Sequence, residues 1–241
     1  MPERSTSSTR PAEGPPETDL QQASPAEPIP EHLLPKPKLR GWFHQVAFFL
    51  TFPAGVVLFS AAQTTAARVA ALIYSFSLAG LYGVSSTYHR RRWSARGFKW
   101  MRRLDHSMIY LLIAGSATPV ALLGLRPPWS ALTLVLVWGG AVLGITLKLL
   151  RIDKFKILTG TLYIVLGWVL FPFAPQLLRS LSDASVALIL IGGVLYTGGA
   201  VVLALNKPNP APATFGYHEI WHAMVIAASA CHYAAVLLLL V

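Results

Sequence analysis

The chain has 241 residues, of which 54% are hydrophobic and only 12% are charged, and its formal net charge is +10. Soluble domains carry about 25% charged residues, so this composition excludes an ordinary soluble globular protein. The excess of basic residues fits a membrane better than a nucleic acid, and no nucleic-acid partner is expected. The single cysteine, Cys231, excludes an intrachain disulfide.

Residues 1–40 form a polar N-terminal segment that differs from the rest of the chain. They contain six of the ten acidic residues and nine of the eighteen prolines, with almost no aromatic side chains. Such a segment cannot bury enough apolar surface to fold. Its start also lacks the basic stretch and apolar stretch of a signal peptide. We therefore expect a disordered cytoplasmic tail at 1–40 and a folded membrane domain at 41–241.

The membrane domain contains seven apolar stretches that are long enough to cross a bilayer. A membrane-spanning helix needs about 20 mostly apolar residues, and charges or turn residues separate the stretches. In chain order they cover residues 42–62, 67–88, 104–124, 129–148, 157–178, 184–205 and 218–241. The sequence predicts an all-α membrane protein with seven transmembrane helices. Gly140 and Gly144, spaced as GxxxG, are expected to let helices pack closely.

The lysines and arginines predict how the chain is oriented in the membrane. If the N-terminus lies inside the cell, seventeen of the twenty basic residues fall on the cytoplasmic side. The three on the outer side are Arg68, Arg126 and Arg179. Membrane proteins concentrate Lys and Arg in cytoplasmic loops. We therefore expect a cytoplasmic N-terminus and, with seven spans, an external C-terminus.

Several polar side chains lie at the ends of predicted spans, all at one depth near the cytoplasmic face. Ionisable groups are costly within a membrane and by default indicate function. In chain order they are Ser85 and His89 at the end of the second span, Asp105 at the start of the third, and His218 and His222 at the start of the seventh. The predicted topology therefore gathers residues that lie more than a hundred positions apart.

The spacing of these residues predicts a metal site. His218 and His222 are one helical turn apart and share a helix face. Two such imidazoles can chelate one Zn²⁺, which takes four ligands, often three from the protein and one water in catalytic sites. His89 could supply the third ligand. Asp105 could then hold and deprotonate the water, and Ser85 could form a hydrogen bond nearby.

Simpler roles remain open for some of these side chains. A histidine at a membrane interface often only extends toward water, which is the role expected for His44. His106 is expected to face lipid headgroups. Asp105 could instead pair with Arg102 or Arg103, and an ion pair at an interface contributes little stability.

Residues 218–222 read HEIWH, which matches the H-E-x-x-H pattern of zinc metalloproteases. In those enzymes the Glu is the general base, and a third ligand follows the motif. Here no acidic residue follows His222, and His232 comes ten residues later instead of six. We therefore reject the protease interpretation and do not expect Glu219 to act as the base. His232 is expected to be a packing or hydrogen-bonding residue.

Three motifs, in this order along the chain, resemble the hemolysin III family. They are SSTYH at 85–89, LDHSMIYLLIAGSATP at 104–119 and GYHEIWH at 216–222, followed by HY at 232–233. That family belongs with the adiponectin and progestin receptors and, more distantly, with alkaline ceramidases in a superfamily of membrane metal-dependent hydrolases. The resemblance covers about residues 41–241. It implies a location in the bacterial plasma (inner) membrane.

The resemblance also implies roles for the same five positions. His89, His218 and His222 match the three histidines that bind zinc near the cytoplasmic side in the receptors. Asp105 matches the aspartate that contacts the zinc-bound water, and Ser85 matches the serine near the end of the second span. The receptors and ceramidases have been linked to hydrolysis of the ceramide amide bond.

The leading expectation is a zinc-dependent membrane hydrolase that acts on a lipid amide or ester. Zn²⁺ would lower the pKa of a bound water to about 7 and polarise the carbonyl. Asp105 would orient the water or act as the base, and Ser85 would support the oxyanion or the site geometry. A site at the membrane boundary suits an amphiphilic substrate, so membrane lipids are the expected partners.

Two alternatives come from other functional classes. One is a cytolytic or pore-forming protein, as the family name suggests, although the mostly apolar spans offer few charges to line an aqueous channel. The other is a receptor or membrane-homeostasis protein in which zinc is structural.

Overall fold

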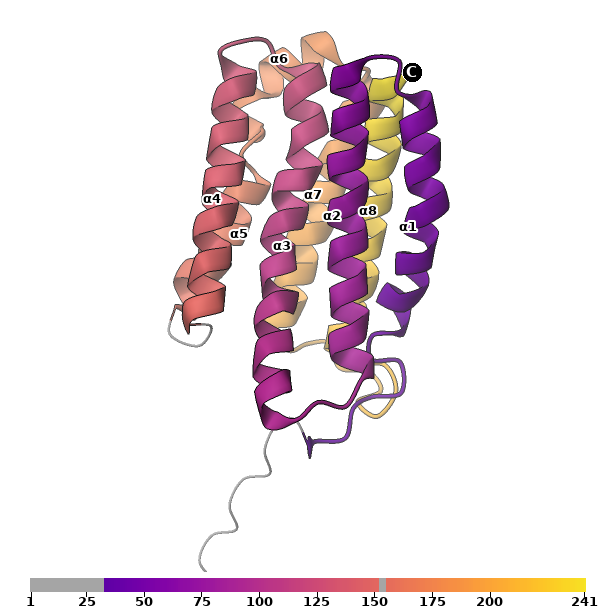
Figure 1. Ribbon diagram of the computed structural model, residues 1–241, viewed down its shortest axis with the longest axis vertical. Helices are drawn as coiled ribbons and strands as arrows, with labels where there is room; N and C mark the ends of the chain where they lie inside the picture. Colours follow the sequence, from indigo (N-terminus) through magenta and orange to yellow (C-terminus); the bar gives the residue numbers. More distant parts are fainter. Residues whose placement is uncertain (1–32, 152–154) are drawn as a thin grey trace, which may run out of the picture. The chain divides into compact units, whose positions relative to one another are not determined.

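The computed structural model describes residues 33–151 and 155–241, and this part of the chain is built from helices (Figure 1). Within these ranges, β pairing is limited to one isolated bridge between Ala211 and Phe215. The helices are α1 (Trp42–Ala61), α2 (Thr65–Arg90), α3 (Ala95–Gly124), α4 (Trp129–Arg151), α5 (Lys156–Gly167), η3 (Phe171–Phe173), α6 (Ala174–Ser180), α7 (Asp183–Leu205) and α8 (Tyr217–Leu240). The predicted all-α class is confirmed.

Seven helical stretches of the described chain are long and apolar enough to cross a membrane. Six of them are α1, α2, α3, α4, α7 and α8, and the seventh, Ile157–Ser180, combines α5, η3 and α6. Large apolar side chains point outward from these helices; Phe76 is 71% exposed and Val135 is 69% exposed. Soluble monomers rarely expose so much apolar surface, which lipid covers in a membrane. The chain is therefore a multi-pass integral membrane protein.

Serine and threonine side chains fix where several helices begin. Each cap accepts a hydrogen bond of 3.1 to 3.2 Å from the backbone N–H three residues later. This bond satisfies one of the N–H groups that the first turn of a helix leaves unpaired. The capping residues are Thr64 before α2, Ser94 before α3 and Ser182 before α7.

The fifth span differs from the prediction of one continuous helix over 157–178. Helix α5 ends at Gly167, and the chain continues through the short helices η3 and α6. Pro172 and Pro175 lie where the helix would have continued. A proline removes one helical hydrogen bond, and its ring clashes with the carbonyl four residues earlier. Hydropathy is insensitive to this break because the interrupted segment stays apolar.

The third span begins earlier than predicted. Helix α3 starts at Ala95, nine residues before the predicted start at 104. This extension is rich in Lys and Arg, so an apolar window excludes it although these residues form helices well. The Ser94 cap starts the helix instead. The predicted span 104–124 lies entirely within α3.

The bundle brings the end of α2 close to the start of α8. Helix α2 packs between α1 and α3, α7 packs along α8, and α8 also contacts α1, α2 and α3. The end of α2 and the start of α8 lie at the same end of the bundle, low in Figure 1. Segments that are distant in the sequence therefore meet there, as the predicted topology required.

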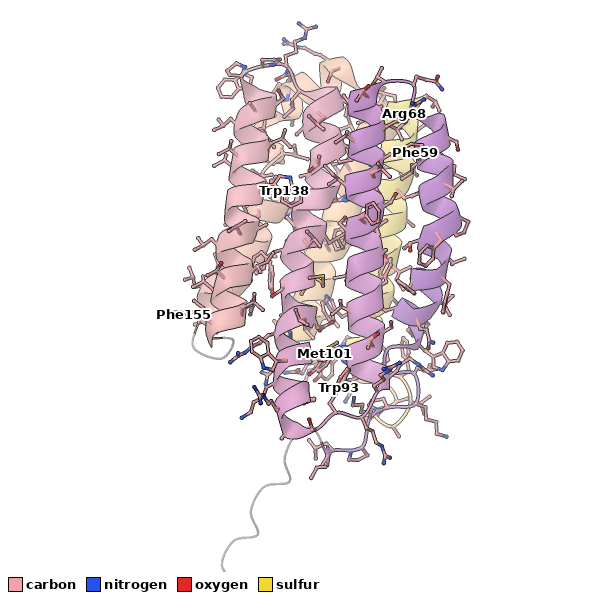
Figure 2. The ribbon with its side chains drawn as sticks, viewed as in Figure 1. Phe59, Arg68, Trp93, Met101, Trp138 and Phe155 are labelled. Atoms are coloured by element: carbon pink, nitrogen blue, oxygen red, sulfur yellow. The ribbon has the colours of Figure 1, made fainter. Side chains whose placement is uncertain are left out.

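Close packing at glycines joins α4 to its neighbours. A Cβ atom added at Gly140 would collide with Leu166 of α5, and one added at Gly144 would collide with the ring of Tyr110 of α3. The predicted role of this glycine pair in tight packing is confirmed. Trp138 of α4, labelled in Figure 2, donates a hydrogen bond of 3.1 Å from Nε1 to the hydroxyl of Thr118 on α3.

Basic residues gather at the end of the bundle where α2 ends. Around the connection from α2 to α3 they are Arg90, Arg91, Arg92, Arg96, Lys99, Arg102 and Arg103. At the other end, Arg68 lies over the ring of Phe59, 5.7 Å from its centroid. Figure 2 shows this pair and Trp93 at opposite ends. The asymmetry on which the predicted orientation depends is therefore present in the fold.

The predicted tail falls partly outside the described residues, because 1–32 are not described. Residues 36–40, which the sequence placed in that tail, pack against the bundle. The backbone N–H of Lys38 donates to Ala213 O (3.1 Å), and that of Leu39 donates to Thr214 O (3.2 Å). The packed region therefore includes these residues in addition to 41–241.

Candidate metal centre

Three histidines from two helices converge at the basic end of the bundle. His89 lies in the last turn of α2, and His218 and His222 lie in the first two turns of α8. One ring nitrogen from each lies within 4.8 Å of the others, and His89 Nε2 lies 3.2 Å from His218 Nε2. Two nitrogens bound to one tetrahedral ion at about 2.0–2.1 Å are about 3.3 Å apart. The spacing therefore fits a shared metal ion.

The burial of these rings also fits a metal. His89 is 6% exposed and His222 is 1% exposed. Neither ring nitrogen of His222 has a hydrogen-bond partner within the described part of the chain. Buried polar atoms are nearly always paired, and an ion bound by the three histidines would pair one of them. These three predicted ligands could hold a metal ion.

Asp105 lies beside this cluster. Its carboxylate is buried, with Oδ2 4.0 Å from His89 Nε2 and 3.8 Å from His106 Nδ1. Among the described residues it does not pair with Arg102 or Arg103, so that alternative is not realised. The ring of His106 is partly exposed and turns toward Asp105, with Nδ1 2.8 Å from the Arg102 carbonyl.

Ser85 is the fifth residue that the sequence predicted for the metal site. It lies one turn before His89 on α2 and is 2% exposed. Its hydroxyl lies against the carboxylate of Asp105. Both residues line the same cavity. The structure therefore brings together all five residues that the sequence predicted for one site.

The cavity that Asp105 and Ser85 line has a volume of about 600 Å³. Its walls come largely from apolar side chains of α3, α5, α7 and α8. On α3 the lining residues run from Asp105 to Val120, which is about 22 Å of helix. The cavity therefore extends from the carboxylate far into the membrane-spanning part of the bundle. Its size is typical of a small-molecule site.

The expectation for His44 was wrong. Instead of extending toward water, His44 is 1% exposed, and its ring stacks on that of His222 with centroids 3.8 Å apart and planes 13° apart. Helix α1 packs against both α2 and α8, which encloses the ring. His44 also lies in the first turn of α1, at the start of a predicted span and in the same layer as the other histidines. That shared layer was the signal that could have identified it.

Two further polar residues of α8, Glu219 and His232, have partners outside the histidine cluster. Glu219 is fully buried, and its carboxylate accepts hydrogen bonds from Gly216 N (2.8 Å) and Arg40 Nε (2.5 Å). Because both carboxylate oxygens are used in this way, Glu219 is not arranged as a catalytic base. His232 Nε2 lies at hydrogen-bonding distance, 3.2 Å, from the Ile189 carbonyl. It is a hydrogen-bonding residue outside the cluster.

Comparison with known proteins identifies the family of this chain. A family model described as "Haemolysin-III related" matches residues 32–233. The chain belongs to this family. Relatives of this haemolysin III chain include "Hemolysin-3" of Bacillus cereus, which is 34% identical over 197 residues, 80% of this chain and 87% of the relative.

Two further relatives extend the comparison. "Hemolysin-3 homolog" of Bacillus subtilis (strain 168) is 32% identical over 80% of this chain and 89% of its own length. Human "Monocyte to macrophage differentiation factor" is 26% identical over 70% of this chain and 69% of its own length. The family predicted from the three motifs is therefore confirmed.

Proposed function

We propose that this haemolysin III chain is a zinc-dependent membrane hydrolase that cleaves a lipid amide or ester. One observation carries the proposal. Three converging, mostly buried histidines lie beside a buried carboxylate, and that carboxylate lines a long apolar cavity. A purely structural metal site needs neither the carboxylate nor the cavity. A hydrolase of amphiphilic substrates needs both.

Each residue of the site has a separate proposed role. His89, His218 and His222 would hold the ion, which would supply Lewis-acid chemistry by polarising a carbonyl and activating water. Asp105, 4.0 Å from His89, accepts the proton of the attacking water. Ser85 either orients that carboxylate or donates its hydroxyl to the carbonyl oxygen of the substrate, because a hydroxyl has a single proton to donate. The apolar cavity walls receive the hydrocarbon chain and exclude bulk water.

The proposal includes an orientation and a location. The basic end of the bundle, with the metal centre, faces the cytoplasm, the N-terminus lies inside and the C-terminus lies outside. The relatives from Bacillus support the plasma membrane of a bacterium as the location. A lipid could then enter the cavity within the bilayer and meet the metal centre at the cytoplasmic boundary.

Turnover of a lipid panel tests the proposal. Purified, zinc-loaded wild-type protein is compared with Asp105→Ala on ceramide-type amides and glycerolipid esters. Because Asp105 is the proposed base, its loss should lower turnover by about 10²–10⁴-fold without releasing zinc. Asp183→Ala is the matched control, since Asp183 begins α7 at the opposite end of the bundle, and it should leave turnover unchanged.

Three results would contradict the proposal. Equal turnover by wild type and Asp105→Ala would remove Asp105 from the chemistry. Bound zinc with no turnover of any lipid would favour the receptor or homeostasis alternative. Leakage of ions from liposomes that persists after loss of the three histidines would favour the pore-forming alternative.

A further inference from the structure

Residues 36–41, here called the strap, run ahead of α1 and contact both helices that carry the histidines. At one end of the strap, Lys36 Nζ donates hydrogen bonds to the carbonyls of His89 (3.0 Å) and Arg91 (3.2 Å). The last carbonyls of a helix have no partner within the helix, and a cation there also complements the helix dipole. Lys36 therefore holds the end of α2 at the residue that carries the first imidazole.

Gly41, at the other end of the strap, passes directly over the same histidine. Its φ of 78° lies in the left-handed region that favours glycine. A Cβ atom there would lie 2.8 Å from the Cβ of His89. Another residue would be strained in its backbone and would displace His89. The strap thus approaches α2 at both the backbone carbonyl and the Cβ atom of one candidate ligand.

Arg40 connects the strap to α8. Its Nε donates to Glu219 Oε1 at 2.5 Å, and the Glu219 side chain is 1% exposed. The other oxygen of Glu219 accepts the backbone N–H of Gly216. Both carboxylate oxygens are therefore used, so Glu219 fixes the first turn of α8 between the two histidines of that helix. Removing one partner of such a buried pair leaves an uncompensated charge.

The pair also affects the electrostatics of the metal centre. The guanidinium of Arg40 lies against Glu219, which directly follows His218 and lies between the two histidines of α8. An unpaired cation there would repel a divalent ion. The carboxylate of Glu219 compensates that charge without using a coordination position. Loss of the Glu219 carboxylate alone should therefore weaken metal binding.

We propose that the strap is a positioning device for the metal centre, in which Lys36 and Gly41 hold His89 while the Arg40–Glu219 pair holds His218 and His222. The inference rests on the proposed metal site and adds to it residues outside the ligand set. Arg40 and Glu219 are positioning residues, since they act through the histidines.

Zinc affinity of the purified full chain tests this inference, measured by competition with a chromophoric chelator. Glu219→Gln should weaken zinc binding by about 10–100-fold, as is typical for groups that orient metal ligands. Arg40→Gln/Glu219→Gln should recover affinity to within about threefold of wild type, because it removes both charges of the pair together. Lys38→Gln, a charge loss in the same strap at an exposed side chain, should leave affinity unchanged.

A second readout, thermal unfolding of the metal-free protein, measures general stability. The unfolding temperature of the metal-free protein should recover in the double variant together with the affinity. If Glu219→Gln does not fold, Lys36→Gln provides the test. Lys36 is exposed, so its loss should leave unfolding unchanged and weaken zinc binding by about threefold.

The outcomes distinguish this inference from the proposed function. Wild-type zinc affinity in the folded Glu219→Gln variant, or in Lys36→Gln where it replaces that test, would overturn the inference alone. A double variant as weak as Glu219→Gln would also overturn it, since charge compensation would then play no part. Wild-type protein that binds no zinc would overturn the proposed metal site and this inference with it.

Discussion

At the scale of single residues, the contact between His44 and His222 decides how firmly one candidate ligand is held. The two rings stack with centroids 3.8 Å apart, and His44 also contacts the ring of Tyr82 at 5.0 Å. Neither ring nitrogen of His44 has a hydrogen-bond partner within the described ranges. The ring surface of His44 therefore supports His222, and its nitrogens are not needed for that role.

Substitutions of His44 separate the effect of its ring surface from the effect of its ring nitrogens. His44→Phe keeps the stacked ring, so zinc content and unfolding temperature should stay close to those of wild type. His44→Ala leaves a cavity beside His222, which should cost about 3 kcal/mol of stability and weaken zinc binding about tenfold. Chelator competition and thermal unfolding in detergent measure both effects. If His44→Phe loses zinc as His44→Ala does, His44 acts through its nitrogens, as a ligand or a hydrogen-bond partner.

The histidine cluster could be predicted from the sequence, because the topology alone places the ends of these spans at one depth. The pairing of His89 with His218 and His222 needed only the number of spans and the helical period. The partner of Glu219 was not predictable, because Arg40 lies in a polar segment without periodicity. The position of His44 was missed because burial of a residue near a helix start depends on which helices pack around it.

At the scale of elements, the sequence predicted which stretches are helices better than where they end. Hydropathy located the seven spans, since about 20 apolar residues suffice to identify one. It overlooked the basic start of α3, where helix propensity and the Ser94 cap determine the boundary. It also overlooked the break in the fifth span, which Pro172 and Pro175 cause without lowering hydropathy.

At the scale of the whole molecule, the two ends of the bundle differ in charge and in their position relative to the cavity. The basic residues and the candidate metal centre lie at one end, and the cavity extends from Asp105 along α3 toward the other. The positive-inside rule then predicts that the candidate metal centre faces the cytoplasm. The cavity would bring a lipid tail from the membrane interior to that side.

Reporter fusions test this orientation in living bacteria. Alkaline phosphatase, which is active only outside the cytoplasm, should be active when fused after Val241 and inactive when inserted after Arg92, between α2 and α3. Green fluorescent protein at the same two positions should give the reverse pattern. The lysines and arginines at the α2 end are the physical reason for this prediction. Activity of the phosphatase at Arg92 alone would invert the orientation.

The zinc content of the purified full chain, measured by plasma mass spectrometry, tests the central claim most directly. Wild type should carry about one zinc per chain, and His218→Ala/His222→Ala should carry almost none, because one histidine cannot hold the ion alone. His232→Ala is the matched control, a histidine of the same helix that lies outside the cluster, and it should keep its zinc. Equal zinc content in wild type and in the double variant would contradict the account.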